Sequence, residues 1–229
     1  MDLSSLSRDA SAASRTDPRT PWLVAGGLLL LCIMIATCWQ TADRLTWFLE
    51  TFPVMVVVPL LVVTHRRYPL TTMLYALIFV HALVLIHGGL YTYAKAPLGF
   101  FMEHWLGTSR NPYDKVGHFF QGLVPALAAR EILVRARYGL GPRMLAFLCV
   151  CIVMAVSACY ELVEWGVAEA SGQAADAFLG TQGDPWDTQS DMAFALIGGL
   201  CAMLFLRRLH DRQLAQLPGA CPGRVASEV

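Results

Sequence analysis

Acidic side chains and a histidine recur at helical spacing in two parts of the chain. Asp114 and His118 are four residues apart, and Asp187 and Asp191 repeat that spacing further along. Residues four apart lie on one face of a helix, so each pair predicts a polar helix face. Imidazole and carboxylate groups brought together can bind a divalent metal ion such as Zn²⁺ or Mn²⁺. Without a metal, a carboxylate can orient the histidine as a general base.

Two glutamates and a lysine extend this set of candidates. Glu161 and Glu164 are three residues apart and therefore lie on roughly one side of a helix, and Lys115 adjoins Asp114. The candidate catalytic residues are His118, Glu161, Glu164 and Asp191. The candidate substrate-binding residues are Asp114, Lys115, Trp186 and Asp187, and the candidate metal ligands are His118, Glu164 and Asp191. No spacing among them is diagnostic of a metal site, so the cofactor stays open between none and a divalent metal.

The elements that carry these residues are apolar enough to cross a membrane. The 229 residues are 56% hydrophobic and 15% charged, whereas soluble domains are about 25% charged. A helix of about 20 apolar residues spans the hydrocarbon core of a bilayer. Because the runs lack the alternation of barrel strands, we expect an all-α polytopic membrane protein with six transmembrane helices. These are 21–39, 47–64, 70–90, 116–134, 144–165 and 191–206.

Basic residues predict the orientation of the chain in the membrane. With the N-terminus inside, thirteen of the 17 lysines and arginines fall on the cytoplasmic side. We therefore expect both termini to be cytoplasmic. The predicted domains are a disordered segment at 1–20, the transmembrane domain at 21–207 and a cytoplasmic tail at 208–229. The zero net charge gives no indication of a nucleic-acid partner; the expected partner is the lipid bilayer.

An internal repeat relates the two polar segments. Residues 103–119 and 176–192 align with a constant shift of 73, sharing Leu, Gly, Thr, Pro and Asp. Each copy precedes an inward-running helix, which is typical of duplicated helical hairpins. By topology, all the ionisable candidates converge on the outer side, where we expect one polar pocket opening outward.

A structural interpretation accounts for part of the same pattern. Asn111 or Asp184 as N-cap, a proline at the first helical position, and Asp114 or Asp187 at the third make good helix starts. The cluster could also be a buried salt-bridge network that only fixes the packing of the helices. Capping leaves His118 unexplained, because it lies seven residues past the predicted cap.

Several long strings in this chain resemble the YjdF-like family of bacterial inner-membrane proteins, whose function is uncharacterised. The resemblance covers about 41–214 and includes "RRYPLT", "NPYDKVGHFFQGLVPALAAREIL", "YELVEW" and "AFLGTQGDPWDTQSDM". A more distant similarity, carried by the Asp-Lys-x-x-His-Phe string at 114–119, links the chain to VanZ-like proteins associated with glycopeptide resistance. The chain lacks the arginine that VanZ-like chains place before their final aspartate. The resemblance implies a membrane-protein family and no mechanism.

Three functions remain open from the sequence. An outward-facing carboxylate–histidine site could act on or bind a lipid-linked or envelope substrate, and the stretch 96–107 is typical of an amphipathic segment on the outer leaflet. Intramembrane acids and an internal repeat also suit a proton- or cation-coupled transporter. The third function is a structural or partner-binding membrane module.

Overall fold

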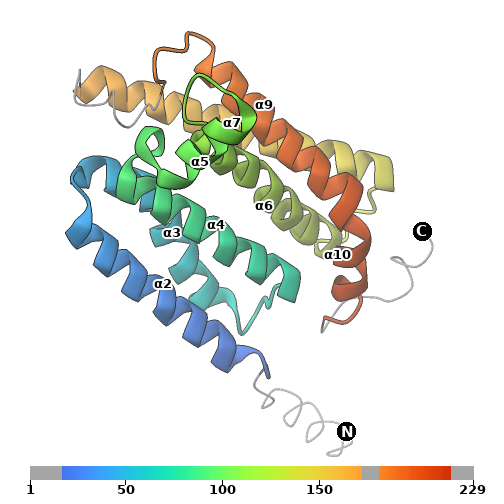
Figure 1. The fold of residues 1–229 in the computed structure, drawn as a ribbon. Coiled ribbons are helices and arrows are strands. Elements are labelled where there is room, and N and C mark those ends of the chain that lie inside the picture. The colour runs from blue at the N-terminus through green and yellow to red at the C-terminus, as the bar shows by residue number, and fades with distance from the viewer. Residues whose placement is uncertain (1–16, 172–180, 218–229) are drawn as a thin grey trace, which may run out of the picture.

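Long apolar helices make up most of the chain in the computed structural model, which describes residues 17–171 and 181–217. No strand occurs within those residues, so the all-α fold class is confirmed. Figure 1 shows the helices as an obliquely packed bundle. The elements are α2 (Thr20–Gln40), α3 (Arg44–Thr64), α4 (Thr72–Tyr91), η1 (Tyr93–Lys95), α5 (Pro97–Leu106), α6 (Tyr113–Arg135), α7 (Pro142–Ser171), α9 (Asp187–Cys201), η3 (Ala202–Leu206) and α10 (Arg207–Leu214).

Five helices of the described chain are long and apolar enough to cross a membrane. They are α2, α3, α4, α7 and the continuous helix Asp187–Leu214 formed by α9, η3 and α10. The sixth predicted span, 116–134, lies within α6, which has 23 residues and is therefore long enough. Five charged residues make α6 more polar than the others: Asp114, Lys115, Arg130, Glu131 and Arg135. The prediction of a membrane protein agrees with the structure, whereas the count of six spans is not confirmed.

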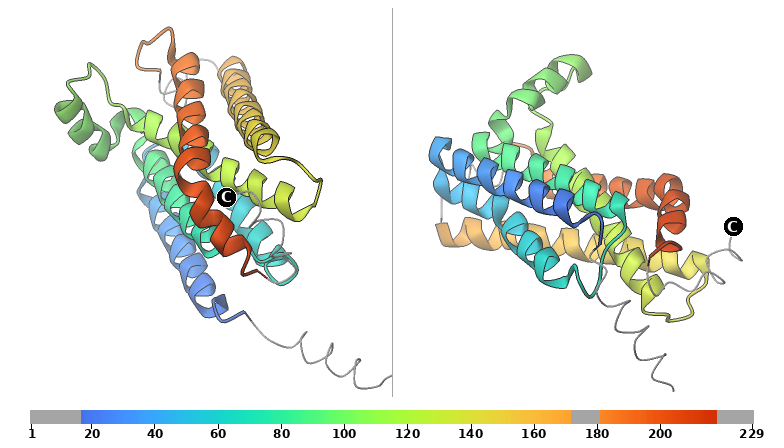
Figure 2. Two further views of the ribbon diagram at one scale, coloured as in Figure 1. Left: turned by 90° about the vertical axis from the view of Figure 1, so that its right-hand side faces the viewer. Right: turned by 90° about the horizontal axis from the view of Figure 1, so that it is seen from below.

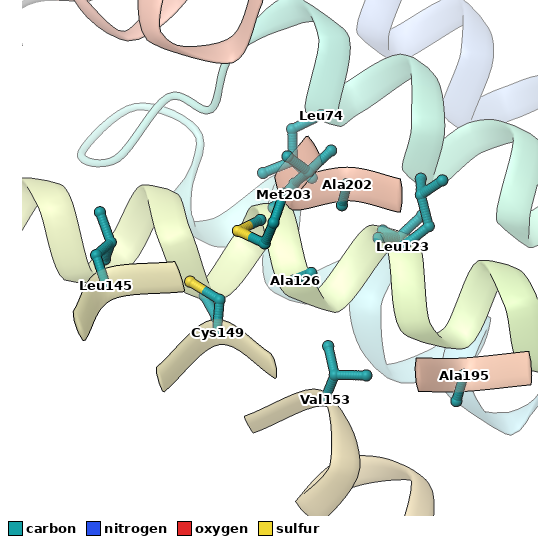
Figure 3. Close-up of a cluster of buried hydrophobic side chains, with 12 residues drawn as sticks. Leu74, Leu123, Ala126, Leu145, Cys149, Val153, Ala195, Ala202 and Met203 are labelled. Atoms are coloured by element: carbon teal, nitrogen blue, oxygen red, sulfur yellow. The ribbon is translucent and has the colours of Figure 1, made fainter. Parts of the chain in front are cut away.

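The polar helix α6 lies at the centre of the bundle. It packs against α4, α7 and α9, and 12 of its residues are buried. Figure 3 shows apolar side chains from all four of these helices meeting in one cluster, among them Leu74, Leu123, Cys149 and Val153. The helices α2 and α7 lie on opposite sides of the bundle (Figure 2). A helix too polar to face lipid is thus enclosed by apolar helices that can.

Glycines allow α6 and α9 to approach closely. A Cβ atom at Gly122 would overlap the backbone carbonyl of Ala195, and one at Gly198 would overlap that of Phe119. Small residues permit such backbone approach in membrane helices. Asp114, His118 and Gly122 follow one another at intervals of four residues, so the polar and the close-packed parts of α6 share one face.

A second polar cluster fixes the opposite end of α6. The carboxylate of Glu131 is fully buried and accepts hydrogen bonds from the Thr71 amide (3.2 Å), the Thr71 hydroxyl (3.0 Å), Arg135 (3.0 Å) and His210 Nε2 (3.0 Å). We call these four residues the Glu131 cluster. It ties the start of α4 and the helix α10 to α6.

The predicted domain limits fall partly on chain that the structure does not describe. Residues 1–16 and 218–229 lie outside the described residues, as do 176–180 of the second repeat copy. The first long helix begins at Thr20, near the predicted limit, and the predicted tail begins inside α10. The duplication itself stays a prediction. The stretch 96–107 contains the short helix α5.

Candidate functional site

Polar side chains start the two helices that carry most of the candidate residues. Asn111 Oδ1 accepts a hydrogen bond from the Tyr113 amide at 3.0 Å, and Asp184 Oδ1 accepts one from the Trp186 amide at 2.9 Å. The helices begin slightly later than predicted, with Pro112 and Trp186 at the N-cap positions. Asp114 and Asp187 lie in the first turns of α6 and α9, as predicted, but not at the third position.

Asp187 and Asp191 bind side chains from outside their own helix. Lys115 Nζ lies 2.9 Å from Asp187 Oδ1 and 2.5 Å from Asp191 Oδ1. Arg110, in the loop before α6, donates to Asp187 at 2.7 Å and forms an ion pair with Asp184 at 2.8 Å. These contacts join the starts of α6 and α9, which agrees with the predicted convergence of the two segments.

His118 is surrounded by carboxylates from three directions. Its Nε2 lies 3.4 Å from Asp114 Oδ1 and 3.8 Å from Asp191 Oδ1. Its Nδ1 lies 3.8 Å from Glu161 Oε1 on α7. The spacing of four residues within α6 and the close packing of α6 on α9 together produce this arrangement.

These residues form one largely buried group, which we call the acid–histidine cluster: Asp114, Lys115, His118, Glu161, Asp187 and Asp191. All of them are buried except Asp114, which is half-buried. Buried charges are costly in an apolar environment unless they are paired or bind a cation. The cluster is therefore either a packing network or a site with a polar ligand.

Two predicted site residues, Trp186 and Glu164, do not belong to this group. Trp186, at the start of α9, is 68% exposed. Its side chain makes no described contact with a residue of the cluster. Glu164 is half-buried and interacts electrostatically with Asp114, His118 and Glu161. However, the three residues whose ligand atoms come within 4.8 Å of one another are Asp114, His118 and Asp191, so Asp114 occupies the place predicted for Glu164.

A glutamate on α3 borders the cluster and was missed by the sequence prediction. Glu50 is buried, and its Oε2 lies 3.5 Å from the hydroxyl of Tyr160. The phenol of Tyr93 also faces it. The signal was available, because a lone acid inside an apolar span is unusual and marks a functional candidate. Burial, followed by the nearby carboxylate of Glu50, raises the pKa of Tyr93 well above its usual value, so this phenol stays neutral.

Arg110 also borders the cluster and was not predicted as a site residue. Burial alone would lower its pKa, but the hydrogen bond and charge of Asp187, together with the charge of Asp184, raise the pKa above its usual value. The guanidinium is thus firmly charged and engaged with carboxylates. Like Lys115, it neutralises the α9 side of the cluster, which leaves the acids around His118 with fewer positive partners.

This arrangement has the components of an acid–base or metal site. An imidazole is held among carboxylates that can orient it, and an ammonium group lies next to them. Carboxylates near one another also attract a cation. The helix α5 lies beside this end of the bundle, held there by the Asn111 side chain, which donates to the Ala96 carbonyl at 2.9 Å.

Comparisons with known proteins give the chain a family. The model of the family DUF2238, described as a predicted membrane protein, matches residues 22–212. The inner membrane protein YjdF of Escherichia coli (strain K12) is 60% identical over 192 residues, which cover 84% of this chain and 92% of that relative. No solved structure matches the chain. The predicted resemblance to YjdF-like proteins is confirmed, and the similarity to VanZ-like proteins stays a prediction.

Proposed function

Since the chain belongs to the DUF2238 family of predicted membrane proteins, we propose that it is a six-span protein of the inner membrane with both termini in the cytoplasm. The name of the E. coli relative supports this membrane. The length of α6 and its enclosure by α4, α7 and α9 support its role as the sixth span. Because an even number of spans puts both termini on one side, reporter fusions at each end test the count: reporters on opposite sides would contradict it.

The acid–histidine cluster is, in this proposal, an outward-facing site that acts on a lipid-linked or envelope substrate. The observation that carries the proposal is the convergence of six polar side chains from α6, α7 and α9 at one end of an apolar bundle. His118 is the acid–base residue, and Asp114 and Asp191 orient it. Lys115 and Asp187 position Asp191 and contact polar parts of the substrate.

The neighbouring helix α5 supports a lipid-linked substrate. Its apolar side chains Leu98, Phe101 and Trp105 are 50%, 60% and 74% exposed and follow one another at helical spacing. Figure 2 shows α5 extending beyond the bundle. Helices with such a face lie in the membrane interface. We therefore place α5 in the outer leaflet, where a lipid-linked substrate would approach the cluster.

Transport of protons or cations is the second candidate function. It is favoured by the Glu131 cluster, since ionisable residues are buried at both ends of α6. Between the two clusters, however, α6 and α9 pack backbone to backbone at Gly122 and Gly198, and apolar side chains fill the surrounding core. A transport path there would require these helices to separate.

Turnover by purified protein tests the enzymatic proposal. The protein is reconstituted with a total polar lipid extract of bacterial inner membrane, and products are followed by mass spectrometry. We expect a product that the wild type forms and that His118→Ala and Asp191→Asn do not. His104→Ala on α5 and Asp211→Asn on α10 are matched controls, since neither residue contacts the cluster by a described interaction. Equal product from all proteins contradicts the proposal, and ion flux that depends on His118 supports transport instead.

A further inference from the structure

Three ligand atoms in the acid–histidine cluster converge as metal ligands do. One ligand atom from each of Asp114, His118 and Asp191 lies within 4.8 Å of the other two. For the imidazole this atom is Nε2, at 3.4 Å from Asp114 Oδ1 and 3.8 Å from Asp191 Oδ1. Ligands about 2.0–2.2 Å from a shared metal ion stand at separations of this order from one another.

The hydrogen bond on the other side of the ring leaves Nε2 available. His118 Nδ1 lies 3.0 Å from the side-chain oxygen of Gln121, which can only accept a hydrogen bond. With the Gln121 amide in this orientation, Nδ1 donates the hydrogen bond. Metal-binding histidines commonly donate their second ring N–H in this way, which fixes the orientation of the ring. A bare lone pair on Nε2 would be repelled by two carboxylates, so Nε2 in this position faces either a proton of its own or a bound cation.

One carboxylate oxygen of the cluster has no hydrogen-bond partner among the described residues. Glu161 is 7% exposed, and its Oε1 has no hydrogen-bond partner among the described residues although it lies 3.8 Å from His118 Nδ1. A buried acceptor without a donor is costly. Glu161 therefore adds an unpaired carboxylate oxygen on the Nδ1 side of the same ring, which increases the negative charge that a cation in the cluster would balance.

The lysine and the arginine near the cluster lie mainly on its α9 side. Lys115 contacts Asp187 and Asp191 at 2.9 Å and 2.5 Å but lies 3.9 Å from Asp114. Arg110 is engaged by Asp184 and Asp187. Among the described residues, positive charge is thus closest to Asp187 and Asp191, and Asp114 has only the longer contact with Lys115.

We propose that Asp114, His118 and Asp191 bind one divalent transition-metal ion, Zn²⁺ or Mn²⁺. One imidazole nitrogen and two carboxylate oxygens suit both ions. Gln121 orients His118, and Lys115 orients Asp191, as outer partners of metal ligands do. A catalytic metal with three protein ligands keeps a position for water or substrate. The inference deepens the proposed function and rests on it for the role of the metal, but binding is measured without any substrate.

Metal content and metal titration test this site directly. The protein is purified in detergent with an affinity tag that contains no histidine, stripped with a chelator and titrated with Zn²⁺, Mn²⁺ and Co²⁺ by calorimetry and absorption. We expect one equivalent of metal per chain. Asp114→Asn, His118→Gln and Asp191→Asn should each weaken binding by more than about tenfold, and Gln121→Ala by about tenfold. His104→Gln and Asp211→Asn are matched controls that should bind as the wild type does, since Asp211 lies on α10 and pairs with Arg130.

The outcomes separate this inference from the proposed function. A folded, monodisperse wild type that binds none of the three ions overturns the metal site, as does binding that the three ligand variants and Gln121→Ala all retain. Size-exclusion profiles and thermal unfolding show which variants are folded, and Gln121→Ala still tests the site if a ligand variant unfolds. Metal binding without turnover of any lipid-linked substrate supports the metal site and contradicts the enzymatic proposal.

Discussion

Replacement of Glu131 by alanine should destabilise the protein severely. The carboxylate of Glu131 is fully buried and accepts four hydrogen bonds that join α6 to α10 and to the start of α4. Its removal leaves the Thr71 amide and hydroxyl and the His210 Nε2 donor without this acceptor. All of these groups are buried, and Arg135 loses its hydrogen-bonded carboxylate as well.

The expected magnitude follows from these contacts. Each buried donor left without an acceptor costs about 1–3 kcal/mol, and breaking a buried pair by removing one partner costs about 3–5 kcal/mol. Because the donors share one carboxylate, these values overlap, and we expect a loss of about 3–5 kcal/mol in the free energy of unfolding. Glu131→Gln keeps one acceptor oxygen and the shape of the side chain, so it should lose less than Glu131→Ala.

Equilibrium unfolding in mixed detergent micelles, followed by circular dichroism, measures this loss. Glu169→Ala is the matched control, because Glu169 is exposed on α7 and should change the stability little. In a double-mutant cycle, Glu131→Ala and His210→Ala should not be additive, since the two side chains are in contact. A free energy of unfolding for Glu131→Ala within about 1 kcal/mol of the wild type would refute the reasoning.

Two further predictions are tested in the same unfolding assay. Gly122→Ala should cost about 1–3 kcal/mol, since its Cβ would overlap the Ala195 carbonyl, whereas Gly27→Ala, with nothing nearby, should be neutral or stabilising. Equal effects of these two glycine variants would show that α6 and α9 are not closely packed. Lys115→Met should cost about 3–5 kcal/mol, and adding Asp191→Asn should restore part of this loss, because the uncompensated acid is then removed. Additive losses would mean that the ion pair contributes little.

The sequence predicted the fold class and the core of the candidate site because both rest on local patterns. Long apolar runs identify membrane helices from composition alone. The intervals of four residues in Asp114–His118 and Asp187–Asp191 place each pair on one face before any tertiary contact is known. The contacts between the pairs then follow from two helices starting at the same end of the bundle.

Details that depend on packing could not be predicted in this way. Glu50 reaches the cluster through Tyr160, which belongs to another helix, and no local pattern relates these two residues. Asp114 rather than Glu164 belongs to the converging trio, and which acid comes near His118 depends on how α7 packs against α6, not on a local spacing. Trp186 stays outside the cluster, since aromatic residues at a membrane boundary are equally suited to the interface itself.

The wide turn η3 determines which way the end of the last membrane helix faces. Asp191 and His210 are 19 residues apart, about 5.3 turns of an uninterrupted α-helix, which would put them roughly a quarter-turn out of phase. The π-type turn at Ala202–Leu206 takes up one extra residue and brings the separation close to five whole turns. Both side chains can therefore meet α6, one through Lys115 and the other through Glu131. A single helical period cannot describe this segment, and the residue positions after the turn follow a phase shifted by one from those before it.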